Sequence, residues 1–97
     1  MAKEKNLHSL SEALNAFIKE NKLQKGIDKV MVRKAWEKIM DNGVNNYTTA
    51  VELRNETLYV SLSSSVLREE LSHGKSKIID MINEELNKDL VKNIVLR

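Results

Sequence analysis

The sequence predicts a single α+β domain with the element order helix, helix, strand, strand, helix, helix, strand, and three observations lead to this prediction. Two stretches with apolar residues at helical spacing come first, and a segment that alternates apolar and polar residues follows them. Two further helical stretches precede residues 91–96, which have the composition of a strand. We therefore expect one domain over residues 1–97 with a small three-stranded sheet and with residues 1–8 frayed.

The first helix is expected from about Leu10 to about Lys22. Ser9 followed three residues later by Glu12 matches a capping box, which is typical of a helix start. Gly26 is a plausible C-terminal stop. The apolar stripe of this helix is Leu10, Ala13, Leu14, Phe17 and Ile18.

The second helix is expected over roughly Asp28–Met40, and the turn residues 41–43 should end it. Its only tryptophan, Trp36, is in phase with Ile39, which favours packing in the core over stacking on a nucleic-acid base. Its apolar residues are Ile27, Val30, Met31, Ala35, Trp36 and Ile39.

A β-hairpin is expected between Val51 and Leu62, with one buried face and one exposed face. Its tip, residues 54–57, lacks the favoured Asn-Gly pair, so the sequence leaves the turn type open. Tyr59 has the strand phase opposite to its neighbours Leu58 and Val60, so it should lie on the other face of the sheet. A tyrosine there is compatible with stacking on nucleic acid and also with ordinary strand composition.

Three serines, residues 63–65, should end the second strand and cap a helix over about Val66–Ser72. Either Ser64 or Ser65 can accept the capping hydrogen bond. The side chains expected to face the core are Val66, Leu67 and Leu71. After a break at residues 73–76 a longer helix resumes, with Ile78, Ile79, Ile82 and Leu86 turned inward.

Composition argues against several classes of protein. The chain has no cysteine, which fits a reducing compartment, and no apolar run near the roughly 20 residues of a membrane span, so we expect a cytoplasmic protein without membrane contact. The two histidines, His8 and His73, have no sequence-local partner that would activate a nucleophile. The carboxylates and histidines match no metal-ligand spacing. We therefore expect no enzyme, no metal, no cofactor and no small-molecule substrate.

Charge is distributed unevenly along the chain. Residues 1–40 carry nine basic and five acidic side chains, whereas the remainder carries seven basic and nine acidic ones. A basic face attracts phosphate, although charged helical faces are also ordinary solvated surface. The candidate phosphate contacts in the second helical stretch and just before it are Lys25, Lys29, Arg33 and Lys34.

The turn that contains Gly74 is the most specific local feature. In a KH domain, two helices are joined by a Gly-x-x-Gly loop whose glycines let the backbone approach the phosphates of a single strand. Here Gly74 precedes Lys75 and Lys77, and the first amides of the following helix would point toward an anion. The second glycine is absent, so an ordinary glycine turn is the alternative interpretation.

The chain also resembles a known family. The residues that carry the resemblance are Trp36, Ile39, Gly43, Thr48-Thr49, Leu58-Tyr59-Val60, Ser63-Ser64-Ser65-Val66, Glu70-Leu71 and Ile82-Asn83-Glu84. Together they are similar to the DciA-like family of bacteria, over roughly residues 14–97. The resemblance implies a KH-like fold, DNA binding and a role in loading the replicative helicase DnaB. Longer members carry a basic or disordered tail that this chain almost lacks, so we expect weaker binding or dependence on a partner.

These observations together predict a non-enzymatic DNA-binding accessory protein of replication. Its partners would be single-stranded or forked DNA, contacted at the phosphates, and the replicative helicase. Two alternatives stay open: a protein-protein adaptor that uses an open sheet edge or the Leu10–Phe17 helix, and an RNA-binding KH-like module.

Overall fold

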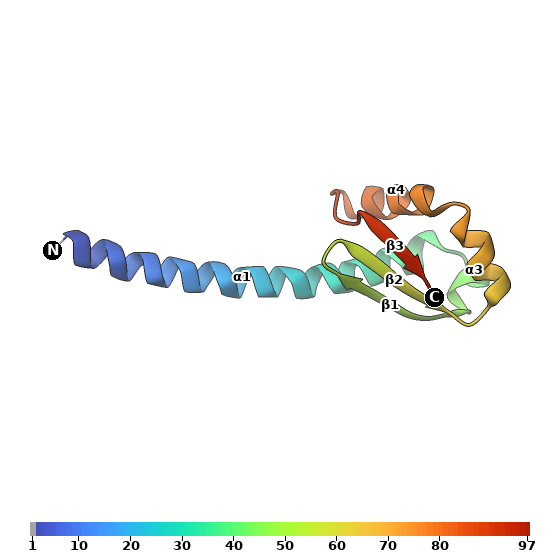
Figure 1. The fold of residues 1–97 in the computed structure, drawn as a ribbon, viewed down its shortest axis with the longest axis horizontal. Coiled ribbons are helices and arrows are strands. Elements are labelled where there is room, and N and C mark those ends of the chain that lie inside the picture. The colour runs from blue at the N-terminus through green and yellow to red at the C-terminus, as the bar shows by residue number, and fades with distance from the viewer. Residues whose placement is uncertain (1) are drawn as a thin grey trace.

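The computed structural model describes the backbone of residues 2–97 and the side chains of residues 9–97 (Figure 1). The expected α+β class is confirmed. The elements are α1 (Ala2–Ile39), α2 (Asn42–Asn45), β1 (Thr48–Arg54), β2 (Thr57–Leu62), α3 (Ser65–Ser72), α4 (Lys75–Leu86) and β3 (Asn93–Leu96). The expected fraying of residues 1–8 stays a prediction, because Met1 and the side chains of residues 2–8 lie outside this description.

The three strands form one mixed sheet in the order β1-β2-β3. β1 and β2 form an antiparallel hairpin in which Val51 lies opposite Val60. β2 and β3 are parallel, with Leu58 beside Ile94. The helices α3 and α4 make the crossover that this parallel pair requires. β1 and β3 are the edge strands of this sheet, and α1 packs against β1.

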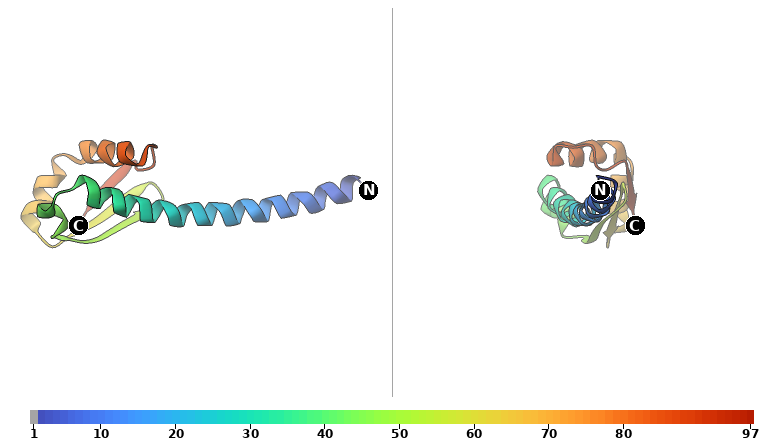
Figure 2. Two further views of the ribbon diagram at one scale, coloured as in Figure 1. Left: turned by 180° about the vertical axis from the view of Figure 1, so that it is seen from behind. Right: turned by 90° about the vertical axis from the view of Figure 1, so that its left-hand side faces the viewer.

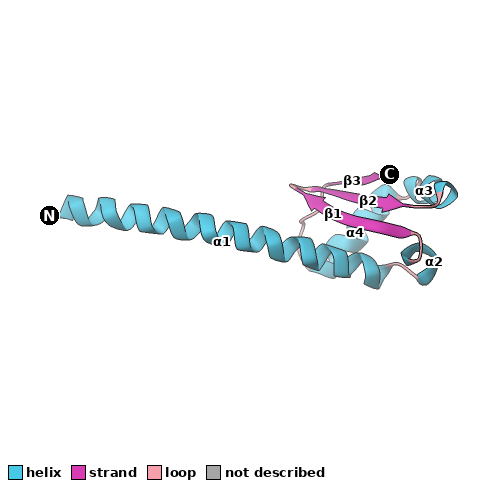
Figure 3. Cartoon of the chain, turned by 90° about the horizontal axis from the view of Figure 1, so that it is seen from below, coloured by secondary structure: helices cyan, strands magenta, loops and turns pink. Residues whose placement is uncertain are grey.

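The core lies between one face of the sheet and a layer made of α4 and the C-terminal part of α1, and the other face of the sheet is open (Figures 2 and 3). Trp36 is fully buried, as predicted, and its indole Nε1 donates a 3.2 Å hydrogen bond to Oγ1 of Thr48. Buried side chains alternate along β1 and β2, which confirms the two-faced hairpin. The buried apolar residues are Val32, Ala35, Trp36, Val51, Leu53, Leu58, Val60, Leu62, Ile78, Ile82, Val91 and Ile94.

The prediction of two separate helices before the hairpin is wrong. A single helix of 38 residues, α1, covers both stretches and passes through Gly26 without a break. No glycine in the described chain has a positive φ angle, so Gly26 does not adopt the left-handed conformation that ends helices. Ser9 lies inside α1 and does not cap it. A glycine costs a helix only about 1 kcal/mol, which the surrounding helix formers offset.

The inward face of α1 also differs from the expectation. Val32, Ala35 and Trp36 are buried, but Ile27, Val30 and Met31 are exposed. The reason is geometric: only the last three turns of α1 lie over the sheet, and a side chain is buried there only if it points at β1 or α4 (Figure 1).

The turn expected after Met40 contains a short helix, α2. The Asp41 carboxylate caps it by accepting a 3.1 Å hydrogen bond from the backbone N–H of Val44. At the hairpin tip, Asn55 adopts a left-handed conformation with φ of 56°, which asparagine tolerates better than most residues. The hairpin therefore turns without an Asn-Gly pair, with Asn55 as its residue of positive φ.

The serine cap of α3 is confirmed at Ser64, whose hydroxyl accepts a 3.2 Å hydrogen bond from the N–H of Leu67. Leu67 and Leu71 pack against the core as predicted. Val66 does not: it is 72% exposed. As the second residue of α3, Val66 points away from the sheet while Leu67 points toward it.

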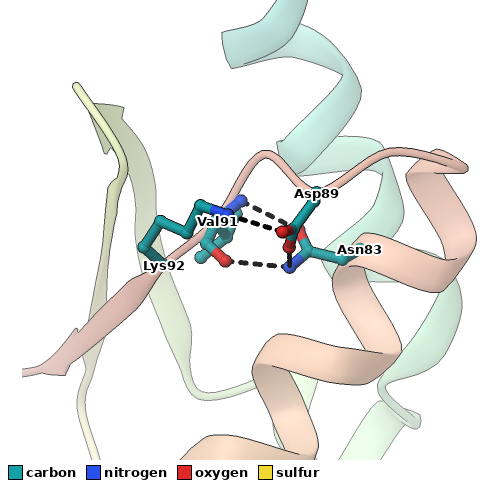
Figure 4. A network of polar contacts seen from close by, with 4 residues as sticks. All are labelled: Asn83, Asp89, Val91 and Lys92. Atoms are coloured by element: carbon teal, nitrogen blue, oxygen red, sulfur yellow. Dashed lines mark hydrogen bonds and ion pairs between the residues drawn. The ribbon is translucent and has the colours of Figure 1, made fainter.

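α4 is joined to the segment that precedes β3 by a network around Asn83 (Figure 4). Its amide nitrogen Nδ2 donates a 2.8 Å hydrogen bond to the carbonyl of Val91, and its Oδ1 accepts one of 2.8 Å from the N–H of Val91. Nδ2 also lies 3.2 Å from Oδ1 of Asp89, which pairs through Oδ2 with Lys92. Asn83 thus satisfies both backbone groups of a buried residue.

Candidate nucleic-acid interface

The turn between α3 and α4 presents free backbone amides. Gly74 is the N-cap of α4 with φ of −125°, and no side chain makes a capping hydrogen bond. The first α4 amide bonded within this turn is that of Ile78, which donates to the Gly74 carbonyl at 3.0 Å. The N–H groups of residues 75–77 therefore point out of the helix start, where the helix dipole favours an anion.

Gly74 has space around it. A Cβ atom placed there would meet no atom within 4 Å, and the backbone conformation is open to other residues. The fold itself therefore does not require glycine at this position. A glycine that the fold does not need is consistent with close approach of a ligand to the backbone.

Three basic side chains of α1 lie beside the edge strand β1. Lys25, Lys29 and Arg33 follow one another at intervals of four residues, which places them along one side of the helix. Lys29 and Arg33 line a groove of about 790 Å³ between α1 and β1. Lys25 and Lys29 line a second hollow of about 310 Å³ that reaches Arg54 and Asn55 at the hairpin tip.

The α1–β1 groove is not uniformly positive. Glu37 and Glu52 line it together with Lys29 and Arg33, so its formal charges balance. A hydrogen bond from Arg54 lowers the pKa of Glu52, and the positive charge of Lys29 contributes to the shift. Glu52 is therefore ionised at neutral pH and moderates the attraction of this groove for phosphate.

The predicted contact residues share one property with Lys19 and Lys22, and it separates them from Lys38, Lys88 and Lys92. Within the described residues, the lysine and arginine side chains that form ion pairs are Lys38, Arg54, Lys88 and Lys92. None of the six cations predicted from the sequence is among them, and none donates a side-chain hydrogen bond there. These six are Lys25, Lys29, Arg33, Lys34, Lys75 and Lys77.

The structure does not bring all the predicted residues together. Gly74, Lys75 and Lys77 lie at the corner between α3 and α4, away from the end of the body where α1 meets the hairpin (Figure 1). Residues 74–77 line neither of the hollows beside α1, and neither does Lys34. The arrangement is therefore two basic clusters: an α1 cluster (Lys25, Lys29, Arg33) and a turn cluster (Gly74, Lys75, Lys77).

Sequence reasoning missed a third feature on the open face of the sheet. The guanidinium carbons of Arg54 and Arg97 lie 5.4 Å and 4.9 Å from the centre of the Tyr59 ring. Strand alternation placed Tyr59 on this face correctly, but the contact with Arg97 depends on the parallel pairing of β3 with β2. No local pattern in the sequence indicates that pairing.

The described residues contain no group of three or more His, Cys, Asp or Glu side chains that could hold a metal ion. His73 lies 3.7 Å from Glu69 in an exposed pair one helical turn apart. Among the helices described, none is both long enough and apolar enough to cross a membrane.

Comparison with known proteins gives one match. The family model described as "Dna[CI] antecedent, DciA" matches residues 9–96. Searches of curated proteins and of solved structures found no significant match. The family model extends from α1 through β3 and so spans every element of the sheet and its helices. The chain therefore belongs to the DciA family, whose members serve as accessory proteins in loading the replicative helicase.

Proposed function

We propose that this protein binds the phosphate backbone of DNA, single-stranded or forked, while it assists loading of the replicative helicase. The observation that carries the proposal is the set of six cations without an acidic partner among the described residues. An unpaired lysine or arginine binds phosphate without first giving up an internal ion pair, and it releases counterions from the DNA when it does so.

The turn cluster supplies the more directional contacts. The N–H groups of residues 75–77 are not capped by a side chain, and the space beside Gly74 is open. Lys75 and Lys77 belong to the same first turn of α4, so they add positive charge at this helix start. Backbone amides at a helix start and flanking cations are a common combination at phosphate sites. Such contacts hold a backbone in place and do not read bases, so binding is expected to be independent of sequence.

The topology supports a KH-like assignment. β2, α3, α4 and β3 form a strand-helix-helix-strand unit whose strands are parallel neighbours, and the glycine-containing turn joins its two helices. This is the position at which KH domains contact a single strand. RNA offers the same phosphates, so RNA is the alternative ligand. A cytoplasmic location accompanies either role.

A second candidate function, docking of a protein segment, is favoured by the α1–β1 groove. Its charges balance, and it runs along the outer side of an edge strand whose backbone groups have no neighbouring strand. An extended segment of a partner such as the helicase would add to β1 there. This surface and the turn cluster are separate, so both functions are compatible with one molecule.

The proposal is tested by fluorescence anisotropy of labelled single-stranded, forked and duplex DNA, and of single-stranded RNA of the same sequence, at several salt concentrations. Binding to single strands should weaken as salt rises, with a log-log slope of about −0.7 for each phosphate engaged. Tighter binding of RNA than of DNA would favour the RNA-binding alternative. No binding at low salt would reject the nucleic-acid role and leave the docking function.

Charge reversal separates the two clusters. Lys75→Glu with Lys77→Glu, and Lys29→Glu with Arg33→Glu, should each reduce affinity and make the salt slope shallower. The matched controls are Lys75→Arg with Lys77→Arg, which keeps the charge, and Lys19→Glu with Lys22→Glu, which makes the same charge change elsewhere on α1. If the controls weaken binding as much as the reversals do, the site assignment is wrong.

A further inference from the structure

The N-terminal half of α1 projects from the body of the protein and carries an apolar stripe that nothing in the described chain covers (Figures 1 and 2). Leu10 is 66% exposed, Leu14 57%, Phe17 64% and Ile18 44%. Single exposed apolar residues are ordinary on protein surfaces, but a contiguous set marks an interaction site. We call these four residues the α1 stripe.

The α1 stripe continues the side of the helix that forms the core. Five turns of an α-helix take 18 residues, so Leu14 has the same orientation as Val32, and Ile18 has the same orientation as Trp36. Val32 and Trp36 are fully buried against the sheet and α4. The side of α1 that packs in the core therefore continues as an apolar surface beyond the body, where no other described element covers it.

We propose that the α1 stripe pairs with the α1 stripe of a second copy of this chain, in antiparallel orientation. A parallel pair is excluded by sterics: the stripe and the body lie on the same side of α1, so two parallel helices would bring both bodies into the same space. An antiparallel pair places the bodies at opposite ends. It also extends the apolar layer that α1 already forms with β1 and α4.

The spacing of the stripe defines a register. With the two-fold axis at Leu14, that residue meets its own copy and Leu10 meets Ile18. Phe17 then lies beside the small side chain of Ser11.

The same helix provides a matched control surface. Leu23 and Ile27 are 67% and 45% exposed and, with Val30 and Met31, line a separate apolar hollow. Ile27 is nine residues from Trp36, which is two and a half turns and places it on the opposite side of α1. An antiparallel pair formed through the α1 stripe leaves this hollow uncovered.

The first experiment is sedimentation equilibrium of the full chain over a wide range of concentration. The overlap is short, so we expect weak association with a dissociation constant of about 10–100 μM, and an average mass that rises from 11.1 kDa toward twice that value. Leu14→Glu with Phe17→Glu should remain monomeric at every concentration, and the control Leu23→Glu with Ile27→Glu should still associate. Circular dichroism verifies that both variants keep their helix content.

The second experiment tests orientation and register. The chain has no cysteine, so an introduced thiol is the only one present. Under mild oxidation, Leu14→Cys should form a disulfide-linked dimer with itself. Leu10→Cys should cross-link with Ile18→Cys in a mixture but not with itself.

Three results would overturn the proposal. The first is a wild-type chain that stays monomeric to several hundred micromolar, and the second is a stripe variant that still dimerises. The third is Leu10→Cys cross-linking to itself, which indicates a parallel pair. If the chain is monomeric and Leu14→Glu abolishes capture by the helicase, the stripe belongs to that partner instead. DNA affinity is measured on the same variants, so that a failure of self-association can be told apart from a failure of DNA binding.

Discussion

Lys88 donates a 2.7 Å hydrogen bond from its Nζ to Oδ1 of Asp28, which lies 60 positions earlier in the chain. Asp28 is the only charged residue in the buried set of the described chain, and Gln24 Nε2 donates to the same oxygen at 2.9 Å. Burial by itself raises the pKa of Asp28, but the hydrogen bonds from Lys88 and Gln24 and the charge of Lys88 outweigh it, so the pKa is lowered. This contact fixes α1 to the segment between α4 and β3.

Replacing Asp28 with Asn should destabilise the protein by about 1 kcal/mol at pH 7, because it removes the charge that Lys88 pairs with. The pKa of Asp28 is lower in the folded state, so its stabilisation is present above the ordinary value of 3.8 and is lost as pH falls through the folded-state pKa. Urea unfolding should therefore show the difference between wild type and Asp28→Asn at pH 7, and show it shrinking below about pH 4. Lys92→Met, which breaks only an exposed pair, is the control and should cost less than about 0.5 kcal/mol.

Replacing Asn83 with Leu should destabilise the protein by about 2–4 kcal/mol. Two hydrogen bonds to the backbone of Val91 are lost, and both of these buried groups are left without a partner. Asn83→Asp should be intermediate, since it keeps an acceptor for the N–H of Val91 but sets an oxygen against its carbonyl. Thermal unfolding measures all three proteins. An unchanged melting temperature for Asn83→Leu would contradict this reading of the network in Figure 4.

Trp36 provides both a stability test and an optical probe. As the only tryptophan, and fully buried, it should emit at short wavelength in the folded protein and shift to the red on unfolding. Trp36→Phe should cost about 1–3 kcal/mol through lost volume and the lost hydrogen bond to Thr48. Thr48→Val keeps the indole but removes this hydrogen bond and the 2.9 Å one that Thr48 Oγ1 donates to the Val44 carbonyl, so it measures the polar contribution without the lost volume. A red-shifted emission from the native protein would show that Trp36 is not in the core.

Gly74→Ala separates folding from binding. No atom lies within 4 Å of the added Cβ, so stability should change by less than about 0.5 kcal/mol. If phosphates approach this backbone closely, affinity for single-stranded DNA should fall several-fold. Anisotropy and urea unfolding of the same preparation give both values. An unchanged affinity would mean that the turn contacts DNA through its lysines alone or does not contact it.

Gly26→Ala tests the continuity of α1. Glycine inside a helix is less favourable than alanine by about 1 kcal/mol, and a Cβ at Gly26 would meet no atom within 4 Å. The substitution should raise helix content and slow amide exchange over residues 10–25, without weakening the body. Reduced helix content would contradict a continuous α1. It would indicate that residue 26 adopts a conformation that alanine disfavours, as expected if a helix ended at Gly26.

The local elements that have a strong hydrophobic period or a clear capping residue could be predicted from the sequence alone. Alternation identified the buried faces of β1 and β2, Ser64 identified the start of α3, and the phase of Trp36 placed it in the core. These features depend on side chains a few residues apart, which a sequence displays directly. The errors at Gly26 and Val66 have the same cause. A glycine occurs both at helix ends and inside helices, and an apolar residue can be buried or exposed. The residues next to it in the sequence do not distinguish these cases.

Which of these elements pack against each other depends on contacts that the sequence does not display. The parallel pairing of β3 with β2 brings Arg97 to Tyr59, and the packing of α4 on α1 brings Lys88 to Asp28. The tertiary structure also determines that Leu14 and Phe17 are exposed, since Val32 and Ala35, five turns further along the same side of α1, lie in the core. A side chain is buried or ion-paired only if another element packs against it. Which element does so is determined by contacts between residues far apart in the sequence.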